Sequence, residues 1–128
     1  MKKARYFIPA GLFYLLIFTL SSRNLDIDLP VRGLDKVAHF IEFSCQGFFL
    51  SLGYFNAFRF SPALTSVLVF FTGLPLGLLD EYHQLFVPGR TSAVGDVIAD
   101  SAGIVWGILV YVYLSKRIRG RRRKEGAD

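Results

Sequence analysis

The chain has 128 residues, of which 52% are hydrophobic, and it carries a formal net charge of +5. A chain of this length forms one domain, and one this apolar lacks the polar residues that a small water-soluble fold needs to cover itself. The composition therefore excludes an ordinary soluble protein and predicts a single membrane domain over residues 1–128. The lone cysteine, Cys45, also excludes an intrachain disulfide and a cysteine-based metal site.

Four apolar runs predict four membrane-spanning helices, because crossing about 30 Å of hydrocarbon takes roughly 20 apolar residues. In chain order these runs cover residues 6–22, 35–57, 62–86 and 94–115. Pro9 suits the first turn of the first helix, and Asp35 is placed to cap the start of the second. Between the third and fourth runs, Pro88 and Gly89 suit a type II turn. The expected fold is an all-α, polytopic bundle of four transmembrane helices.

Basic residues at the two ends of the chain predict its orientation. Lys2, Lys3 and Arg5 precede the first run, and a dense basic run fills the tail at 116–128. An even number of spans puts both termini on one side, which the positive-inside rule makes the cytoplasm. These residues are typical of cytoplasmic flanks rather than of a nucleic-acid-binding face. The first run also fits a cleaved signal peptide, but residues 19–23 offer no convincing small-residue cleavage site.

Polar residues interrupt three of the four apolar runs, and in each run they share one face of the predicted helix. An ionisable side chain in hydrocarbon costs several kcal/mol unless it is paired, protonated or hydrated, so these positions are the first place to look for function. Residues three, four or seven apart lie on one face of a helix. The three resulting stripes are Asp35, His39, Glu42 and Gln46; Gly73, Gly77, Asp80 and Gln84; and Asp96, Asp100, Gly103 and Gly107.

The acids lie toward the outer ends of their helices, and two of the stripes carry paired glycines deeper down. Small residues at this spacing let membrane helices approach closely, so we expect three helices to bring their acids into one cluster in the outer part of the bilayer. Lys36 and Arg90 border the acids and are expected to pair with them. The residues expected to bind a ligand are Asp35, Lys36, His39, Glu42, Asp80, Glu81, Gln84, Arg90, Asp96 and Asp100. The glycines that also suit contacts in a homo-oligomer are Gly73, Gly77, Gly103 and Gly107.

Two segments of the chain, LDKVAHFIEFSCQGFFL and LLDEYHQLFVPGRTSAVGDVIADSAGIVWG, resemble the VanZ-like family of bacterial membrane proteins. That family opens one span with Asp-Lys-x-x-His-Phe, and Asp-Glu-x-x-Gln-x-Phe-x-Pro-Gly-Arg leads into its last span. The positions that match the family pattern are Asp35, Lys36, His39, Asp80, Glu81, Gln84, Pro88, Gly89, Arg90, Ser92, Asp96 and Gly103. At Asp100 the family usually has Asn, so an acid here changes the buried charge.

The resemblance implies a four-helix, multi-pass protein of the bacterial inner (cytoplasmic) membrane with a role in the cell envelope. The family is named for resistance to teicoplanin, a glycopeptide antibiotic, which makes such resistance an expected but secondary property. The implied partners are membrane lipids or a lipid-linked envelope precursor, and no nucleic acid.

The leading functional hypothesis is that the outward-facing polar cluster binds an anionic lipid headgroup or a lipid-linked glycan. Lys36 and Arg90 would hold phosphate, because an ammonium and the planar donor fork of a guanidinium both suit it. We assign no metal and no cofactor to this function.

Two alternatives stay open, and with them whether the protein is an enzyme. The first is a membrane-embedded hydrolase or transferase acting on a lipid or lipid-linked substrate, with His39, Glu42 and Asp80 as catalytic candidates. Within this alternative, a divalent metal held by these three residues and Asp100 is conceivable. The second is a proton-coupled lipid flippase or small transporter in which Glu42 and Asp100 relay protons.

Overall fold

A computed structural model describes residues 3–23, 33–90 and 92–125 of the chain. The elements are a short 3-10 helix, η1 (Ala4–Phe7), followed by four α-helices: α1 (Ile8–Ser21), α2 (Leu34–Ala57), α3 (Pro62–Gln84) and α4 (Val94–Glu125). No strand occurs in these described ranges, so the predicted all-α fold is confirmed. The fourth helix continues well beyond residue 115, where the predicted span ends.

The ends of the helices follow from local chemistry. Pro9 lies in the first turn of α1, as expected, and the Ser61 side chain accepts a hydrogen bond from Leu64 N at 3.2 Å to cap α3. The cap of α2 is Gly33, with φ +94°, and Asp35 lies inside the first turn. The prediction that Asp35 is the N-cap is therefore wrong by two residues, although an acid in the first turn still favours the positive end of the helix dipole.

The link between α3 and α4 contains the predicted tight turn. Arg90 N donates to Val87 O at 3.1 Å, and Gly89 has φ +80°. A positive φ at the third residue of the turn is the mark of type II, and glycine takes it without strain. The turn aims the chain from the end of α3 back toward the start of α4.

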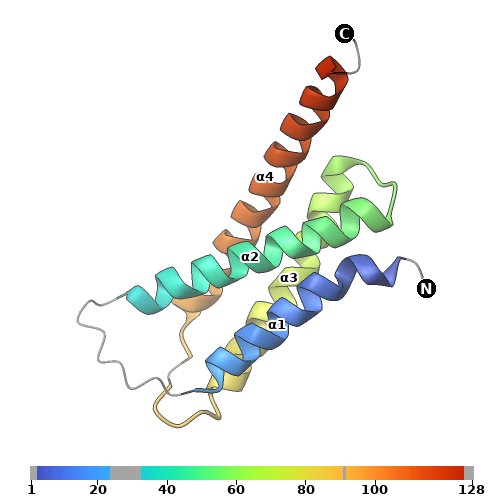
Figure 1. Cartoon of the computed structure of the whole chain (residues 1–128). Coiled ribbons are helices and arrows are strands. Elements are labelled where there is room, and N and C mark those ends of the chain that lie inside the picture. Colours follow the sequence, from blue (N-terminus) through green and yellow to red (C-terminus); the bar gives the residue numbers. More distant parts are fainter. Residues whose placement is uncertain (1–2, 24–32, 91, 126–128) are drawn as a thin grey trace.

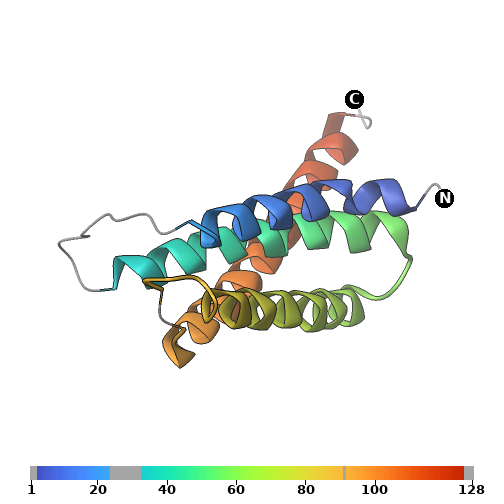
Figure 2. The same cartoon turned by 90° about the horizontal axis from the view of Figure 1, so that it is seen from below.

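The four helices run alternately up and down, and α4 crosses the others obliquely (Figures 1 and 2). The start of α1, the link between α2 and α3, and the end of α4 lie toward one end of the molecule (Figure 1). The start of α2, the end of α3 and the start of α4 lie toward the opposite end (Figure 1). The three polar stripes thus point their acid-bearing ends to the same region.

Glycines set the closest helix contacts, as the small-residue spacing predicts. A Cβ added at Gly103 would lie 2.5 Å from Phe40 O, and one added at Gly107 would overlap Ser44 O, so α4 packs on the backbone of α2. On α3, an added Cβ at Gly73 would meet the Ile104 side chain at 2.9 Å. These contacts lie within one chain and account for the glycines there; a homo-oligomer stays a prediction.

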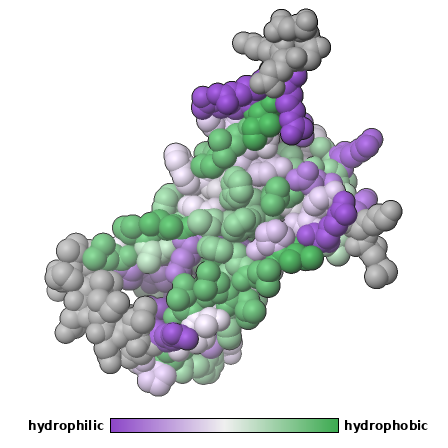
Figure 3. All heavy atoms as spheres, in the orientation of Figure 1, coloured by the Kyte–Doolittle hydropathy of each residue, from purple (hydrophilic) through white to green (hydrophobic). Residues whose placement is uncertain are grey.

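The outside of the molecule is largely apolar, while its interior combines a small apolar core, which includes Phe43 and Ile104, with many buried polar residues. Large apolar side chains such as Leu12, Phe71 and Val94 are exposed at 63%, 64% and 78%. Figure 3 shows hydrophobic residues over most of the visible face, with hydrophilic residues gathered toward its ends. The buried polar and charged residues include Ser51, Thr65, Asp80, Glu81, Asp96 and Asp100. This inversion of the soluble pattern is what contact with lipid requires.

Three helical segments are long and apolar enough to cross a membrane: Ala4–Ser21, Pro62–Gln84 and Val94–Arg122. They support a multi-pass membrane protein. Helix α2 has the length, at 24 residues, but its polar residues lower its mean hydropathy. His39 and Gln46 on this helix are buried, so they do not face the lipid.

Candidate functional site

The candidate site lies where the start of α2, the end of α3 and the start of α4 meet. We call it the polar site, and its buried members are His39, Asp80, Glu81, Gln84, Asp96 and Asp100. Each helix places its members by turn periodicity: four residues separate Asp80 from Gln84, and four separate Asp96 from Asp100. The structure thus brings residues of all three predicted stripes together.

His39 is the centre of the polar site. Its Nδ1 lies 3.0 Å from Asp100 Oδ1 and 3.7 Å from Glu81 Oε1. Its Nε2 lies 3.5 Å from Gln84 Nε2. A hydrogen bond from Nδ1 to a carboxylate fixes the orientation of the imidazole ring, and it leaves Nε2 to accept from the Gln84 amide. One side chain of α2 is thereby joined to both α3 and α4.

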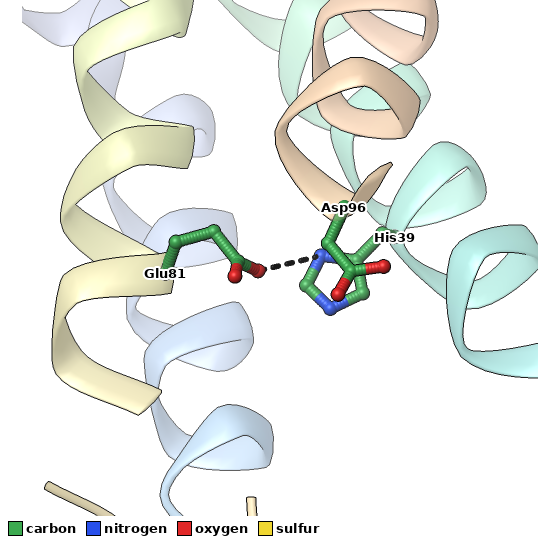
Figure 4. Close-up of side chains that lie close together, drawn as sticks. All are labelled: His39, Glu81 and Asp96. Atoms are coloured by element: carbon green, nitrogen blue, oxygen red, sulfur yellow. Dashed lines mark ion pairs between the residues drawn. The ribbon is translucent and has the colours of Figure 1, made fainter. Parts of the chain in front are cut away.

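Glu81 links the end of α3 to the start of α4. Its Oε2 accepts hydrogen bonds from Ser92 Oγ at 2.8 Å and from Ala93 N at 3.1 Å. Its Oε1 is buried and has no hydrogen-bond partner in the described part of the chain. Figure 4 shows this carboxylate directed toward His39, with Asp96 beside the imidazole. One oxygen anchors the carboxylate, and the other is free to bind something else.

Asp80 and Asp96 are both buried but are paired differently. Asp80 Oδ2 accepts from Gln84 Nε2 at 2.9 Å, one helical turn away. Asp96 Oδ1 lies 2.8 Å from the ammonium of Lys36, whose side chain is 46% exposed and also reaches Asp35 at 3.5 Å. The expected pairing of Lys36 with an acid is observed, and it ties α2 to α4.

Arg90 does not form the expected pair with Asp80 or Glu81. Among the described residues it makes no ion pair within 4.0 Å, and its Nε is buried without a hydrogen-bond partner. The Arg90 side chain as a whole is half-buried. Its guanidinium is therefore a charged donor group that the described chain leaves unused, at the rim of an acidic site.

The remaining candidates lie around this centre. Glu42 is half-buried and lies within electrostatic range of Asp80, Asp100 and Arg90. Asp35 is exposed and contacts only Lys36 among the ion pairs of the described residues. Glu42 and Asp35 therefore border the polar site and make none of its hydrogen bonds in the described chain.

The polar site carries more buried negative charge than the chain neutralises. Four carboxylates are buried there, from Asp80, Glu81, Asp96 and Asp100, against one imidazole, the half-exposed Lys36 ammonium and the half-buried Arg90 guanidinium at the rim. One oxygen on each of Asp80, Glu81 and Asp100 accepts no hydrogen bond from the part of the chain that the structure describes. Uncompensated charge of this kind is expensive in a water-poor interior, so bound protons or a bound cation must offset part of it.

The sequence-based reasoning missed the contribution of the segment before α4. Ser92 and the backbone N–H of Ala93 hold Glu81, yet neither is among the residues expected at the site. The signal for Ser92 was present, because it is one of the positions that match the family pattern. The backbone N–H of Ala93 could not be found in this way, because a backbone donor does not depend on the identity of the residue.

Comparison with known proteins gives one family. Neither a curated protein nor a solved structure matches the chain. The family model described as VanZ/LLP1 matches residues 2–115, which include η1, α1, α2 and α3, the first two thirds of α4 and every member of the polar site. The chain therefore belongs to the VanZ/LLP1 family.

Proposed function

We propose that this protein is a four-span envelope protein of the bacterial inner membrane whose polar site binds the phosphate of a lipid headgroup or lipid-linked glycan. The observation that carries the proposal is the guanidinium of Arg90 at the rim of the site, which forms no ion pair with the described residues and whose buried Nε has no hydrogen-bond partner among them. Guanidinium groups hold phosphate through paired, charge-assisted hydrogen bonds. The half-exposed Lys36 supplies a second cation on the facing helix.

In this proposal helix α2 also spans the membrane, in addition to the three helical segments that are long and apolar enough by composition. Its 24 residues extend about 36 Å at 1.5 Å per residue, enough to cross the hydrocarbon. The polar residues that lower its hydropathy are mostly turned inward, and its outer face carries exposed apolar residues such as Val37 and Ile41. A helix of this kind is stable in a bilayer when its neighbours cover the polar face.

The orientation that fits the proposal puts the polar site toward the periplasm. Arg59, in the link between α2 and α3, and the basic end of α4 lie at the opposite end of the molecule from the site (Figure 1). The positive-inside rule assigns that basic end, with both termini, to the cytoplasm. A site on the outer leaflet would meet envelope precursors, and a contribution to teicoplanin-type resistance would follow from binding one.

Arg90→Ala tests the proposal directly. The protein is purified from bacterial membranes in mild detergent, and the retained lipids are identified by native mass spectrometry. We expect wild-type protein to retain a phosphate-bearing lipid. The amount of that lipid retained by Arg90→Ala should be lower by a factor of at least about ten, since a hydrogen bond to a charged group contributes roughly 1.5–3 kcal/mol.

Arg59→Ala is the matched control, because it removes the same charge at the opposite end of the molecule. It should retain the lipid at the wild-type level. Equal lipid in wild type and Arg90→Ala, or equal loss in both variants, contradicts binding at the polar site.

A further inference from the structure

Three side chains of the polar site converge as metal ligands do. His39, Glu81 and Asp96 come from α2, α3 and α4, and one nitrogen or oxygen of each lies within 4.8 Å of the others. Figure 4 shows the three side chains pointing toward one another. Two ligand atoms on one ion lie at most about 4.4 Å apart, twice a bond of about 2.2 Å, so small side-chain rotations bring the set into range.

Hydrogen bonds fix the orientation of the Glu81 carboxylate, as they do for carboxylates that bind metal ions. Ser92 Oγ and Ala93 N donate to its Oε2, while the buried Oε1 has no hydrogen-bond partner among the described residues and forms a long ion pair with His39 Nδ1 at 3.7 Å. Groups that hydrogen-bond to a ligating carboxylate or imidazole fix its orientation and tune its affinity for metal. A buried carboxylate oxygen that is fixed in direction, accepts no hydrogen bond in the described chain and faces an imidazole nitrogen at 3.7 Å is suited to bind a cation together with that nitrogen.

We propose that the polar site binds one divalent transition-metal ion through His39, Glu81 and Asp96. An imidazole nitrogen with carboxylate oxygens and no thiolate suits Mn²⁺, Fe²⁺ or Zn²⁺. A charge of +2 would offset two of the excess carboxylates. This ligand set differs from the one conceivable from the sequence, because it includes Glu81 and Asp96 and leaves out Glu42 and Asp80.

Asp100 and Gln84 flank the imidazole of His39. Asp100 Oδ1 lies 3.0 Å from His39 Nδ1, but the three ligand atoms that lie within 4.8 Å of one another belong to His39, Glu81 and Asp96, so Asp100 borders the proposed ion site and is not one of its ligands. When Nδ1 binds the metal, the proton of the ring moves to Nε2. The Gln84 amide beside Nε2 then turns over, so that its oxygen accepts a hydrogen bond from Nε2–H and its donation to Asp80 is lost.

Lys36 occupies the metal side of the site in the structure. Its ammonium lies 2.8 Å from Asp96, and its stem passes over Gly95, where a Cβ would lie 2.8 Å from Lys36 Cε. Because the Lys36 side chain is 46% exposed, it can leave Asp96 for water when an ion arrives. This last step rests on the proposed function: the freed Lys36 ammonium and the metal ion would together bind the phosphate of the headgroup.

The test is metal binding by the intact protein. Chains purified in detergent are stripped with EDTA and titrated with Mn²⁺, followed by electron paramagnetic resonance, and with Zn²⁺, followed by elemental analysis. We expect one ion per wild-type chain. Glu81→Gln and Asp96→Asn should each raise the Kd at least about ten-fold, the least that even outer-shell losses cost.

Asp35→Asn is the matched control, since it removes an exposed carboxylate that borders Lys36 and should leave the Kd unchanged. Circular dichroism and gel filtration verify that each variant is folded. Wild-type protein that binds less than one ion overturns the proposal whatever the variants do. So do folded Glu81→Gln and Asp96→Asn variants that bind metal as wild type does.

The experiments can contradict the metal site and the headgroup function independently of each other. Arg90→Ala should keep the ion and lose the lipid. Lipid that is lost in Arg90→Ala but unaffected by EDTA and by Glu81→Gln overturns the metal's role and leaves the proposed function standing. A stoichiometric ion in a wild-type protein that retains no lipid overturns the proposed function and leaves the metal site standing.

Discussion

At the scale of residues, the unusual position is Asp100. It is 1% exposed, holds His39 with one oxygen and leaves the other without a partner in the described chain. Its neighbours across the helices include Gly77, where a Cβ would lie 3.0 Å from Asp100 Oδ2. The resemblance to VanZ-like proteins places Asn at this position in most members. An amide would keep the acceptor for the imidazole and remove one buried negative charge.

We therefore expect Asp100→Asn to stabilise the metal-free protein. Uncompensated buried charge is costly, and Asn removes one such charge, keeps an acceptor for His39 and adds amide N–H groups that can donate to nearby carboxylate oxygens; we expect this gain to exceed the weakening of the pair with His39. The measurement is the Tm of EDTA-treated protein in detergent, followed by the fluorescence of Trp106. Asp100→Ala, which deletes both the charge and the acceptor, should lower the Tm. A lower Tm for Asp100→Asn would show that the charge itself holds the site together.

The sequence predicted that acids would meet but not how each would be bound. Lys36 pairs with Asp96, sixty residues away, while Arg90 forms no ion pair with any described residue although it lies nearer to Asp80 and Glu81 along the chain. The spacing of residues along the sequence shows which of them share a face of their own helix. The partner depends on the rotation and depth of the neighbouring helix, which a single sequence does not contain.

At the scale of elements, the contact between α2 and α4 positions the site. Gly103 and Gly107 let α4 lie on the α2 backbone at Phe40 and Ser44, directly beneath His39 and Asp100. In a membrane there is little hydrophobic force between helices, so close packing of this kind supplies much of the attraction. The geometry of the polar site depends on this contact.

Gly107→Ala should weaken that contact. A methyl group there would overlap the Ser44 carbonyl, and a backbone atom cannot turn aside as a side chain can. Overpacking of this kind costs typically 1–3 kcal/mol, so we expect a lower Tm and weaker metal and lipid binding. Gly11→Ala on α1 is the control, because nothing lies within 4 Å of its added Cβ. Equal melting temperatures for the two variants would contradict the packing argument.

The elements themselves were largely predictable from apolar run length. The predicted starts at residues 62 and 94 coincide with those of α3 and α4, because Pro and turn residues precede each run. The end of α4 was not predictable in this way. Hydrocarbon thickness limits a span to about 20 residues, whereas the Lys and Arg beyond it are good helix formers and continue the helix to Glu125.

At the scale of the whole molecule, polar and apolar residues are distributed both between the interior and the surface and along the length of the helices. Apolar side chains cover the middle of the visible face (Figure 3), the buried acids lie on helix ends that meet at one end of the molecule, and the basic end of α4 lies at the opposite end (Figure 1). A bilayer stabilises this arrangement only when the basic end stays in the cytoplasm and the acids are covered by neighbouring helices. The proposed topology is therefore a consequence of charge distribution and not a separate assumption.

That topology can be measured with a thiol reagent that does not cross membranes. In a Cys45→Ala background, Pro88→Cys labels the turn between α3 and α4, and Phe60→Cys labels the link between α2 and α3; both positions are exposed. We expect Pro88→Cys to react in cells with a permeable outer membrane and an intact inner membrane. Phe60→Cys should react only after the inner membrane is opened, because an even number of spans separates it from the cytoplasmic N-terminus. Labelling of both positions in intact cells would contradict a spanning α3, and reversed labelling would place the polar site in the cytoplasm, where it could not meet outer-leaflet lipids.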